Sequence, residues 1–285
     1  MLIVDSQVHL WGGGRIVTPE SAHHFQNPAY TKDDILKEMD RAGVDRVIVV
    51  PPVFASVPPG GTPNDHALLA AREHPDRFAV MGKIRLEEPE ISRPLLSGWK
   101  KQQGMLGIRL VFNKEFRHLL SDGSADWVWP HLEEADIPIM VLVLPGELDY
   151  LETVAERHPG LRITIDSMAT PRLSSGPDAF RQMPKLVAMA KLPNVSVKAS
   201  GMPSTSTEPY PYWDVETYIR QVFDAYGPRR VFWGTDLTRM PCSYRSCVTH
   251  FTEELPWLRG EDLELVMGKA VCQWLQWPLP NEKAG

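Results

Sequence analysis

The segment LIVDSQVHLW (residues 2–11) decides the fold, because a short β-branched run leads directly into polar side chains. Its first part, LIVDSQV, has the length and composition of a buried strand, and His9 follows where that strand would end. Seven comparable runs occur later in the chain, and longer segments of helical period separate them. This alternation predicts βα units arranged around a parallel sheet.

Eight strands are expected, and several are almost continuously apolar, as in strands covered on both faces. The runs are LIVDSQV (2–8), RVIVVP (46–51), FAVMGKI (78–84), LGIRLVF (106–112), IMVLVL (139–144), RITIDS (162–167), VSVKAS (195–200) and RVFWGTD (230–236). Helices are expected to start after Thr31, Thr62 and Ser124, which suit amino-terminal caps. We therefore predict an α/β protein with a (β/α)8 TIM barrel, formed by residues 1–285 as a single domain.

The main alternative is an open, doubly wound sheet. That fold binds dinucleotides through a glycine-rich turn between a strand and a helix. Residues 12–14 are GGG and follow the first strand, but a polar, proline-containing segment comes next instead of a helix. The barrel is therefore the better prediction.

Composition excludes several classes of partner. The net charge of −6 and the lack of clustered basic residues give no basis for nucleic-acid binding. No stretch approaches the roughly 20 apolar residues that span a bilayer, so no membrane partner is expected. The three cysteines, Cys242, Cys247 and Cys272, lack the spacing of a disulfide framework or a structural zinc site. We expect a cytoplasmic protein.

Barrel geometry brings polar residues from the carboxyl ends of different strands to one mouth. Buried charges are costly unless they are paired or used, so several charges aimed at this mouth indicate a functional site. The candidates are Gln7, His9, Arg85, Arg109, Asp166, Ser167, Lys198, Asp236 and Arg239. Asp166 is interpreted as mainly structural, through a buried ion pair with a residue such as Arg109.

Several segments together carry a family resemblance. The chain resembles the amidohydrolase superfamily, in the amidohydrolase-related branch (amidohydrolase 2), and is similar to 2-pyrone-4,6-dicarboxylate lactonase and related lactone hydrolases. The resemblance rests on the order and spacing of LIVDSQVHLW (2–11), GIRLVF (107–112), LRITIDSMATP (161–171), RVFWGTDLTRMP (230–241) and VMGKAVCQWLQWP (266–278). It covers almost the whole chain and implies a hydrolase.

The resemblance also implies where metal ligands would lie. In the family, the first strand usually ends in His-x-His, the sixth in Asp-His and the eighth in Asp. This chain has Gln7 and Ser167 in place of histidines, and it keeps His9 and Asp236. Catalytic zinc normally has three protein ligands, so a count of two predicts no metal cofactor. The alternative is one divalent metal such as zinc, bound through Gln7, His9 and Asp236.

Asp236 matches the family's general base, and we expect it to deprotonate an attacking water. A carboxylate can do so without a metal if the electrophile is reactive and donors polarise its carbonyl. His9 is the second expected catalytic residue. The expected substrate-binding residues are Gln7, Arg85, Arg109, Ser167, Lys198 and Arg239. Among these residue types, arginine best fits the two oxygens of a carboxylate.

Two further groups of residues lie on presumed mouth loops. His23 and His24 are adjacent and could bind a metal, but neighbouring residues seldom face the same way, so a solvated loop is expected. One or more aromatic side chains on these loops are expected to line a pocket, namely Trp11, Phe54, Tyr210, Tyr212 or Trp213.

The resulting hypothesis is hydrolysis of a small anionic lactone, a cyclic ester, by Asp236 and a water molecule. Three alternatives stay open: a nonoxidative decarboxylase of the same branch, a metal-dependent hydrolase, and a noncatalytic barrel that binds a small molecule. The sequence leaves the natural substrate, its ring size and the oligomeric state undetermined, although homodimers are common in such families. The expected partner is a small cyclic anion.

Overall fold

The computed structural model describes residues 1–12, 24–25, 27–53, 61–144 and 146–280. Eight parallel strands form one sheet in sequence order. They are β1 (Val4–Val8), β2 (Arg46–Val49), β3 (Phe78–Gly82), β4 (Met105–Phe112), β5 (Ile139–Val143), β6 (Ile163–Ile165), β7 (Val195–Ser200) and β8 (Val231–Gly234). The predicted (β/α)8 architecture is confirmed as a nearly closed barrel, and each strand lies within its predicted run or one residue beyond it.

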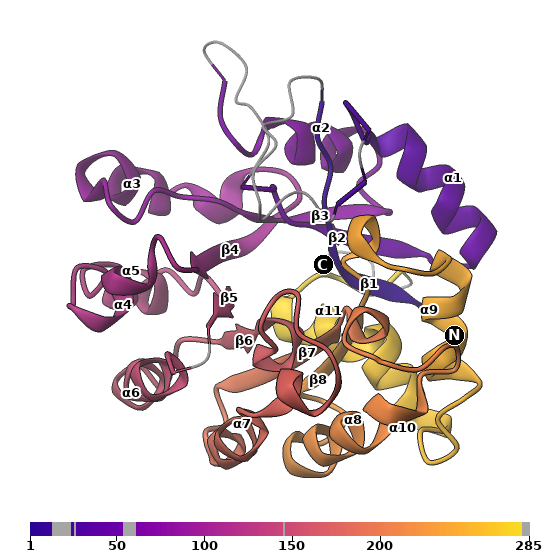
Figure 1. Ribbon diagram of the computed structural model, residues 1–285. Coiled ribbons are helices and arrows are strands. Elements are labelled where there is room, and N and C mark those ends of the chain that lie inside the picture. The colour runs from indigo at the N-terminus through magenta and orange to yellow at the C-terminus, as the bar shows by residue number, and fades with distance from the viewer. Residues whose placement is uncertain (13–23, 26, 54–60, 145, 281–285) are drawn as a thin grey trace.

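The helices surround this barrel (Figure 1). They are α1 (Lys32–Ala42), α2 (Asp65–Glu73), α3 (Pro89–Leu96), α4 (Arg117–Ser121), α5 (Val128–Glu134), α6 (Leu148–Arg157), α7 (Met183–Ala188), α8 (Trp213–Tyr226), α9 (Tyr244–Thr252), α10 (Gly260–Glu264) and α11 (Ala270–Leu275). Among the described residues, no helix combines the length and the apolar character needed to cross a membrane.

One of the three predicted helix starts is confirmed. Thr31 precedes α1, where its backbone N–H donates to the Asp34 carboxylate at 2.8 Å. The other two predictions are early, because α2 begins at Asp65 and α5 at Val128. Thr62 instead lies outside the helix, where its backbone N–H donates a hydrogen bond to Asp65 Oδ2 at 2.8 Å.

The seam between β1 and β8 closes through side chains as well as the backbone. The N–H of Asp236 donates to the Gln7 carbonyl at 2.9 Å, and the N–H of Thr235 donates to Asp5 Oδ1 at 2.9 Å. Gly234 makes this approach possible, since a Cβ atom there would lie 2.5 Å from Ser6 Oγ. The seam therefore positions the residues that follow β1 and β8.

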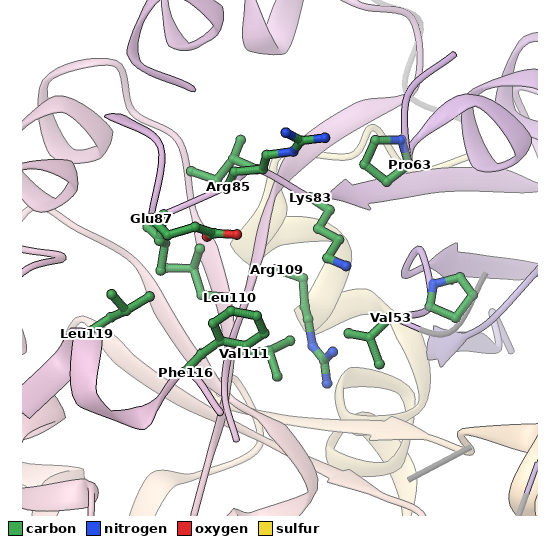
Figure 2. A pocket seen from close by; sticks show the side chains of 13 residues that line it. Val53, Pro63, Lys83, Arg85, Glu87, Arg109, Leu110, Val111, Phe116 and Leu119 are labelled. Atoms are coloured by element: carbon green, nitrogen blue, oxygen red, sulfur yellow. The ribbon is translucent and has the colours of Figure 1, made fainter. Parts of the chain in front are cut away.

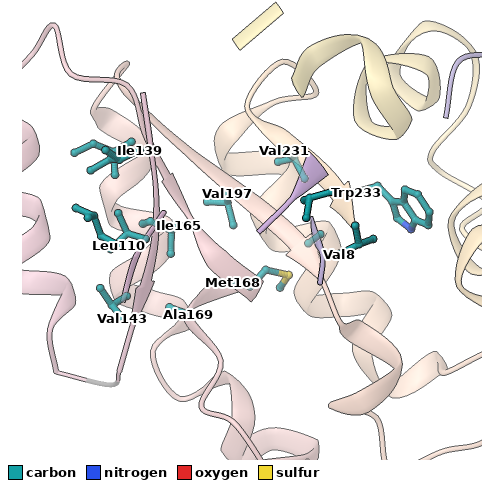
Figure 3. Close-up of a cluster of buried hydrophobic side chains, with 14 of the residues drawn as sticks. Val8, Leu110, Ile139, Val143, Ile165, Met168, Ala169, Val197, Val231 and Trp233 are labelled. Atoms are coloured by element: carbon teal, nitrogen blue, oxygen red, sulfur yellow. The ribbon is translucent and has the colours of Figure 1, made fainter. Parts of the chain in front are cut away.

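Two apolar clusters hold the barrel together. The larger cluster lies between the outer face of the strands and the helices, and part of it is drawn in Figure 3. The smaller cluster joins Val4, Ile48 and Phe232 on the strands to Val271 and Leu275 on α11. The chain's last helix thus packs against the inner residues of the first and last strands, which leaves the carboxyl ends of the strands for polar groups.

Candidate active site

Asp236 is buried two residues after the end of β8, where its backbone takes a left-handed conformation with φ of 55°. Such a conformation is costly for a residue with a Cβ atom, and surrounding contacts must maintain it. Its Oδ1 lies 3.2 Å from His9 Nε2, and its Oδ2 accepts a hydrogen bond from Arg239 Nε at 2.5 Å. The structure thus brings together three of the residues expected from the sequence.

The orientation of His9 follows from its second ring nitrogen. His9 Nδ1 lies 2.7 Å from the carbonyl oxygen of Val50, which can only accept a hydrogen bond. Nδ1 therefore carries the proton, and Nε2 points toward Asp236. The backbone after β2 consequently fixes the direction of the side chain that follows β1.

Asp236 is ionised in this environment. Burial alone would raise the pKa of its carboxyl group, but the opposite charge of Arg239 and the interaction with His9 lower the pKa well below the ordinary value. The carboxylate is therefore charged throughout the neutral range, and it has two defined neighbours.

Arg109, Asp166, Lys198 and Gln7 form a second, connected group inside the barrel. Arg109 Nε lies 3.1 Å from Asp166 Oδ2, and Lys198 Nζ lies 2.7 Å from Asp166 Oδ1. Lys198 also donates to Gln7 Oε1 at 2.6 Å. The side chain of Gln7 thus binds an ammonium group in the position where the family resemblance implied a metal ligand.

Asp166 balances the two buried cations of this group. Burial opposes its ionisation, but Lys198 and Arg109 outweigh that effect and lower the pKa of Asp166. Burial conversely lowers the pKa of Lys198, against the attraction of Asp166. The ion pair between Asp166 and Arg109 expected from the sequence is present.

Two other predicted substrate-binding residues have different surroundings. Ser167 is buried, with its Oγ 3.0 Å from Ser200 Oγ. Arg85 is exposed, and its guanidinium contacts both oxygens of Glu88 at 3.1 Å. Both contacts are with neighbouring side chains, and neither Ser167 nor Arg85 pairs with Asp236 in the described part of the chain.

His24 contradicts its predicted place on a solvated loop. Its side chain is buried, and its Nδ1 lies 2.7 Å from Thr238 Oγ1. The rings of His9 and His24 meet edge to face, with centroids 5.3 Å apart. The prediction failed because the burial of His24 depends on the turn after β8, which is remote in sequence. His23 lies outside the described residues.

His9, His24 and Asp236 form a group that could bind a metal ion. Each offers one ligand atom, all three residues are buried, and the three atoms lie within 4.8 Å of one another. His24 is therefore a third candidate ligand, in addition to the two counted from the sequence. Two imidazoles and one carboxylate suit zinc. A ligating histidine also usually donates its other ring N–H to a fixed acceptor, as His9 Nδ1 does to a backbone carbonyl.

Two cations near these groups were not identified from the sequence. Arg172 follows the turn after β6, where burial lowers its pKa to about 10, and both Asp236 and Asp166 attract its charge. Lys83 directly follows β3 and lines a cavity that Arg109 also lines. Lys83 was identifiable by the same rule as His9, since it too directly follows the last residue of a strand. Arg172 lies beyond a strand end, where sequence alone does not specify direction.

The cavity that Lys83 and Arg109 line has an aromatic side chain in its wall that was not expected from the sequence. Phe116 contributes the aromatic side chain to the wall of this cavity. Trp11 and Tyr212 are buried, and Tyr210 and Trp213 are exposed. Phe54 lies outside the described residues.

Comparisons with known proteins agree with this fold. A family model described as "Amidohydrolase" matches residues 4–285. An L-fucono-1,5-lactonase of Burkholderia ambifaria is 33% identical over 217 residues, which cover 71% of this chain and 68% of that protein. A 4-sulfomuconolactone hydrolase of Hydrogenophaga intermedia is 27% identical over 246 residues, which cover 81% of this chain and 73% of that protein.

A solved structure extends the likeness to the whole fold. The crystal structure of an amidohydrolase from Burkholderia multivorans, with bound zinc, superposes with a TM-score of 0.80. Its sequence is 20% identical, and the match covers 98% of this chain and 100% of that one.

Proposed function

The chain belongs to the amidohydrolase family, and from this premise we propose that it hydrolyses small anionic lactones with Asp236 as the general base. The observation that carries the proposal is the buried carboxylate after β8, held between His9 and Arg239. Two relatives that are named for lactone hydrolysis support the reaction class.

Asp236 has the geometry to receive a proton. Arg239 binds Oδ2 at 2.5 Å, and Oδ1 faces His9 Nε2 at 3.2 Å, so Oδ1 is the oxygen to which we assign the proton from a water molecule beside His9. The hydroxide formed in this way attacks the ring carbonyl, and the ring C–O bond then breaks. The released alkoxide takes the proton back from Asp236, so the product carries one hydroxyl group and one carboxylic acid, which then loses its proton to solvent and becomes a carboxylate.

The low pKa of Asp236 limits the reaction to reactive substrates. A carboxylate that binds its proton weakly is a weak base, which makes water activation difficult. Cyclic esters with a good leaving group meet this requirement better than ordinary amides do. Cations near the carboxylate, Arg239 and Arg172, favour the negative charge that develops on the carbonyl oxygen.

His9, His24 and Asp236 would hold a divalent cation such as zinc, which when bound supplies polarisation of the carbonyl and a lower pKa for water. The chain's own contribution is to orient these ligands. Val50 fixes His9, and Arg239 fixes Asp236. Lactone hydrolysis without a metal stays a prediction, to be tested by turnover after treatment with a chelator.

Substitution of the proposed base tests the function. We expect Asp236→Asn to lower kcat/KM for a carboxylated lactone by about 10²- to 10⁴-fold, the range for loss of a general base. Asp178→Asn is the matched control, because Asp178 is an exposed carboxylate paired with Arg181. We expect the control to retain full activity. Circular dichroism would confirm that both variants fold.

Two results would contradict this proposal. Turnover by folded Asp236→Asn at the rate of the control would remove Asp236 from the mechanism. A product that has lost carbon dioxide instead of gaining water, measured by mass spectrometry, would indicate a decarboxylase.

A further inference from the structure

A cavity of about 250 Å³ lies at the carboxyl ends of β3 and β4. Its wall carries three basic side chains, Lys83, Arg85 and Arg109, and one acidic side chain, Glu87. Apolar side chains, including Val53 and Phe116, form another part of the wall. Figure 2 shows Lys83 and Arg109 extending into this cavity from neighbouring strands.

Lys83 is held firmly by its backbone. Its N–H donates to Asn64 Oδ1 at 2.7 Å, and its carbonyl accepts from Asn64 Nδ2 at 3.1 Å. Its side chain is half-buried, and Nζ forms no ion pair with any described residue. Burial and the nearby charge of Arg109 lower the pKa of Lys83. The fold thus holds the ammonium group of Lys83 near the guanidinium of Arg109, and among the described contacts no carboxylate pairs with Lys83.

Arg109 has donors left over after its ion pair with Asp166. The residue is only 4% exposed, and Nε makes the contact to Asp166. Its Nη2 forms no hydrogen bond with the described part of the chain. A buried donor without a partner is costly, so its position is best explained by a ligand that accepts from it.

The other charged side chains of this wall leave these two cations available. Arg85 is exposed, and its guanidinium is engaged by Glu88. Glu87 is exposed, and no ion pair joins it to Lys83 or Arg109 in the described structure. The local charge therefore favours one anionic group between Lys83 and Arg109.

We propose that Lys83 and Arg109 bind a carboxylate attached to the substrate's ring, while Val53 and Phe116 contact the ring itself. The guanidinium can donate in parallel to two carboxylate oxygens, and the ammonium adds a second charge. This inference rests on the proposed lactone hydrolysis and makes Lys83 a specificity-determining residue. The cavity suits a single ring, because pockets for larger, drug-sized ligands occupy about 300–1,000 Å³.

Arg109 connects this cavity to the proposed catalytic centre. Arg109 pairs with Asp166, which also pairs with Lys198, and Lys198 donates to the side-chain oxygen of Gln7. The backbone carbonyl of Gln7 in turn accepts a hydrogen bond from the N–H of Asp236. The proposal requires that a ring anchored by its carboxylate at Lys83 place its ester bond beside Asp236, which does not itself line the cavity.

Calorimetric titration with benzoate tests the subsite without any turnover. Benzoate has one carboxylate on a flat apolar ring, as the proposal requires. We expect Lys83→Met to weaken benzoate binding at least tenfold and Lys83→Arg to restore it to within about threefold. Lys37→Met, which removes an exposed lysine of α1, is the control and should bind like the wild type. Equal affinity of Lys83→Met and the control would overturn the proposal.

Kinetics with two matched substrates test specificity. The first is a γ-lactone with a carboxylate on the ring, and the second has a carboxamide in its place. We expect Lys83→Met to raise KM for the first at least tenfold, with kcat within about twofold, and to leave KM for the second unchanged. Equal shifts for both substrates would contradict a carboxylate-binding role. If the wild type hydrolyses neither lactone, lactone hydrolysis fails as the function, while benzoate binding still reports on Lys83.

Discussion

At the scale of single residues, the site depends on which neighbours each charged side chain has. Asp166 and Asp236 are both buried carboxylates at strand ends. Asp166 is shared by two cations that are themselves buried, and it therefore serves mainly to balance charge. Asp236 contacts His9 and Arg239, and its carboxylate belongs to the group that could bind a metal. Residue type alone does not separate these two roles.

The burial of His250 on α9 predicts that the stability of the protein depends on pH. The ring is 1% exposed, and neither nitrogen forms a hydrogen bond with the described residues. It packs edge to face against Tyr212, with centroids 5.4 Å apart. Burial lowers the pKa of His250 to about 4. Below pH 6.5 the unfolded chain therefore binds this proton more readily than the folded protein does, and stability is lost as the pH falls toward 4.

The expected effect of His250 is measurable between pH 7 and pH 5. At about 1.36 kcal/mol per pH unit below roughly 6.5, the penalty at pH 5 is about 2 kcal/mol. We expect His250→Leu to avoid this penalty, so that its free energy of unfolding in urea improves by about 2 kcal/mol relative to the wild type between these pH values. His118→Leu, at an exposed histidine, should show no such change. Parallel pH profiles for wild type and His250→Leu would show that His250 titrates normally.

At the scale of elements, strained turns follow two of the strands at the barrel mouth. Ser167, Met168 and Ala169 after β6 have φ of 49°, 53° and 55°, and Asp236 after β8 has φ of 55°. Left-handed backbone costs about 1–2 kcal/mol for each such residue. The turn after β6 also explains why that strand is shorter than predicted, since the chain leaves extended conformation at Asp166. These turns direct side chains that a regular strand would place elsewhere.

The close packing of Gly234 in the seam between β1 and β8 predicts that a larger residue there destabilises the protein. We expect Gly234→Ala to lower the free energy of unfolding by about 1–3 kcal/mol, the usual cost of overpacking, because its Cβ would lie 2.5 Å from Ser6 Oγ and 3.2 Å from Ser200 Cβ. Thermal or urea unfolding measures the change.

A matched glycine controls for the loss of backbone freedom. A Cβ atom on Gly98 would meet no heavy atom within 4 Å in the described part of the chain, apart from its immediate neighbours, and the φ of −112° is open to alanine. Gly98→Ala should therefore leave stability unchanged or raise it by less than about 1 kcal/mol. If both alanine variants were equally stable, close packing at the seam would not be the reason for glycine at position 234.

At the scale of the whole molecule, the candidate metal ligands come from both ends of the chain. His9 and His24 precede α1, and Asp236 follows β8. Only barrel closure brings them together. Zinc titration monitored by calorimetry is expected to show one site in the wild type, and His24→Ala is expected to weaken it at least tenfold. His118→Ala, at an exposed histidine, is the control. Equal zinc affinity in all three proteins would rule out this ligand group.

The charge of the whole molecule also differs from the charge of its site. The chain carries a net charge of −6, yet Arg109, Arg172, Lys198 and Arg239 lie near the two buried carboxylates, and Lys83 lies beside Arg109. A negative total charge therefore does not oppose recognition of an anion, because nearby buried charges dominate the local potential.

The sequence by itself determined the barrel, because eight apolar runs alternate with helical segments and strand ends must converge in that topology. It also placed His9, Arg109, Lys198 and Asp236 in or just after strands, which the structure confirms as their position in the fold. The tertiary structure alone decided that His24 joins them, that Gln7 binds Lys198, and that Lys83 and Arg109 share a cavity. The physical reason is that strand periodicity is local, whereas the pairing of buried charges depends on distances between residues that are remote in sequence.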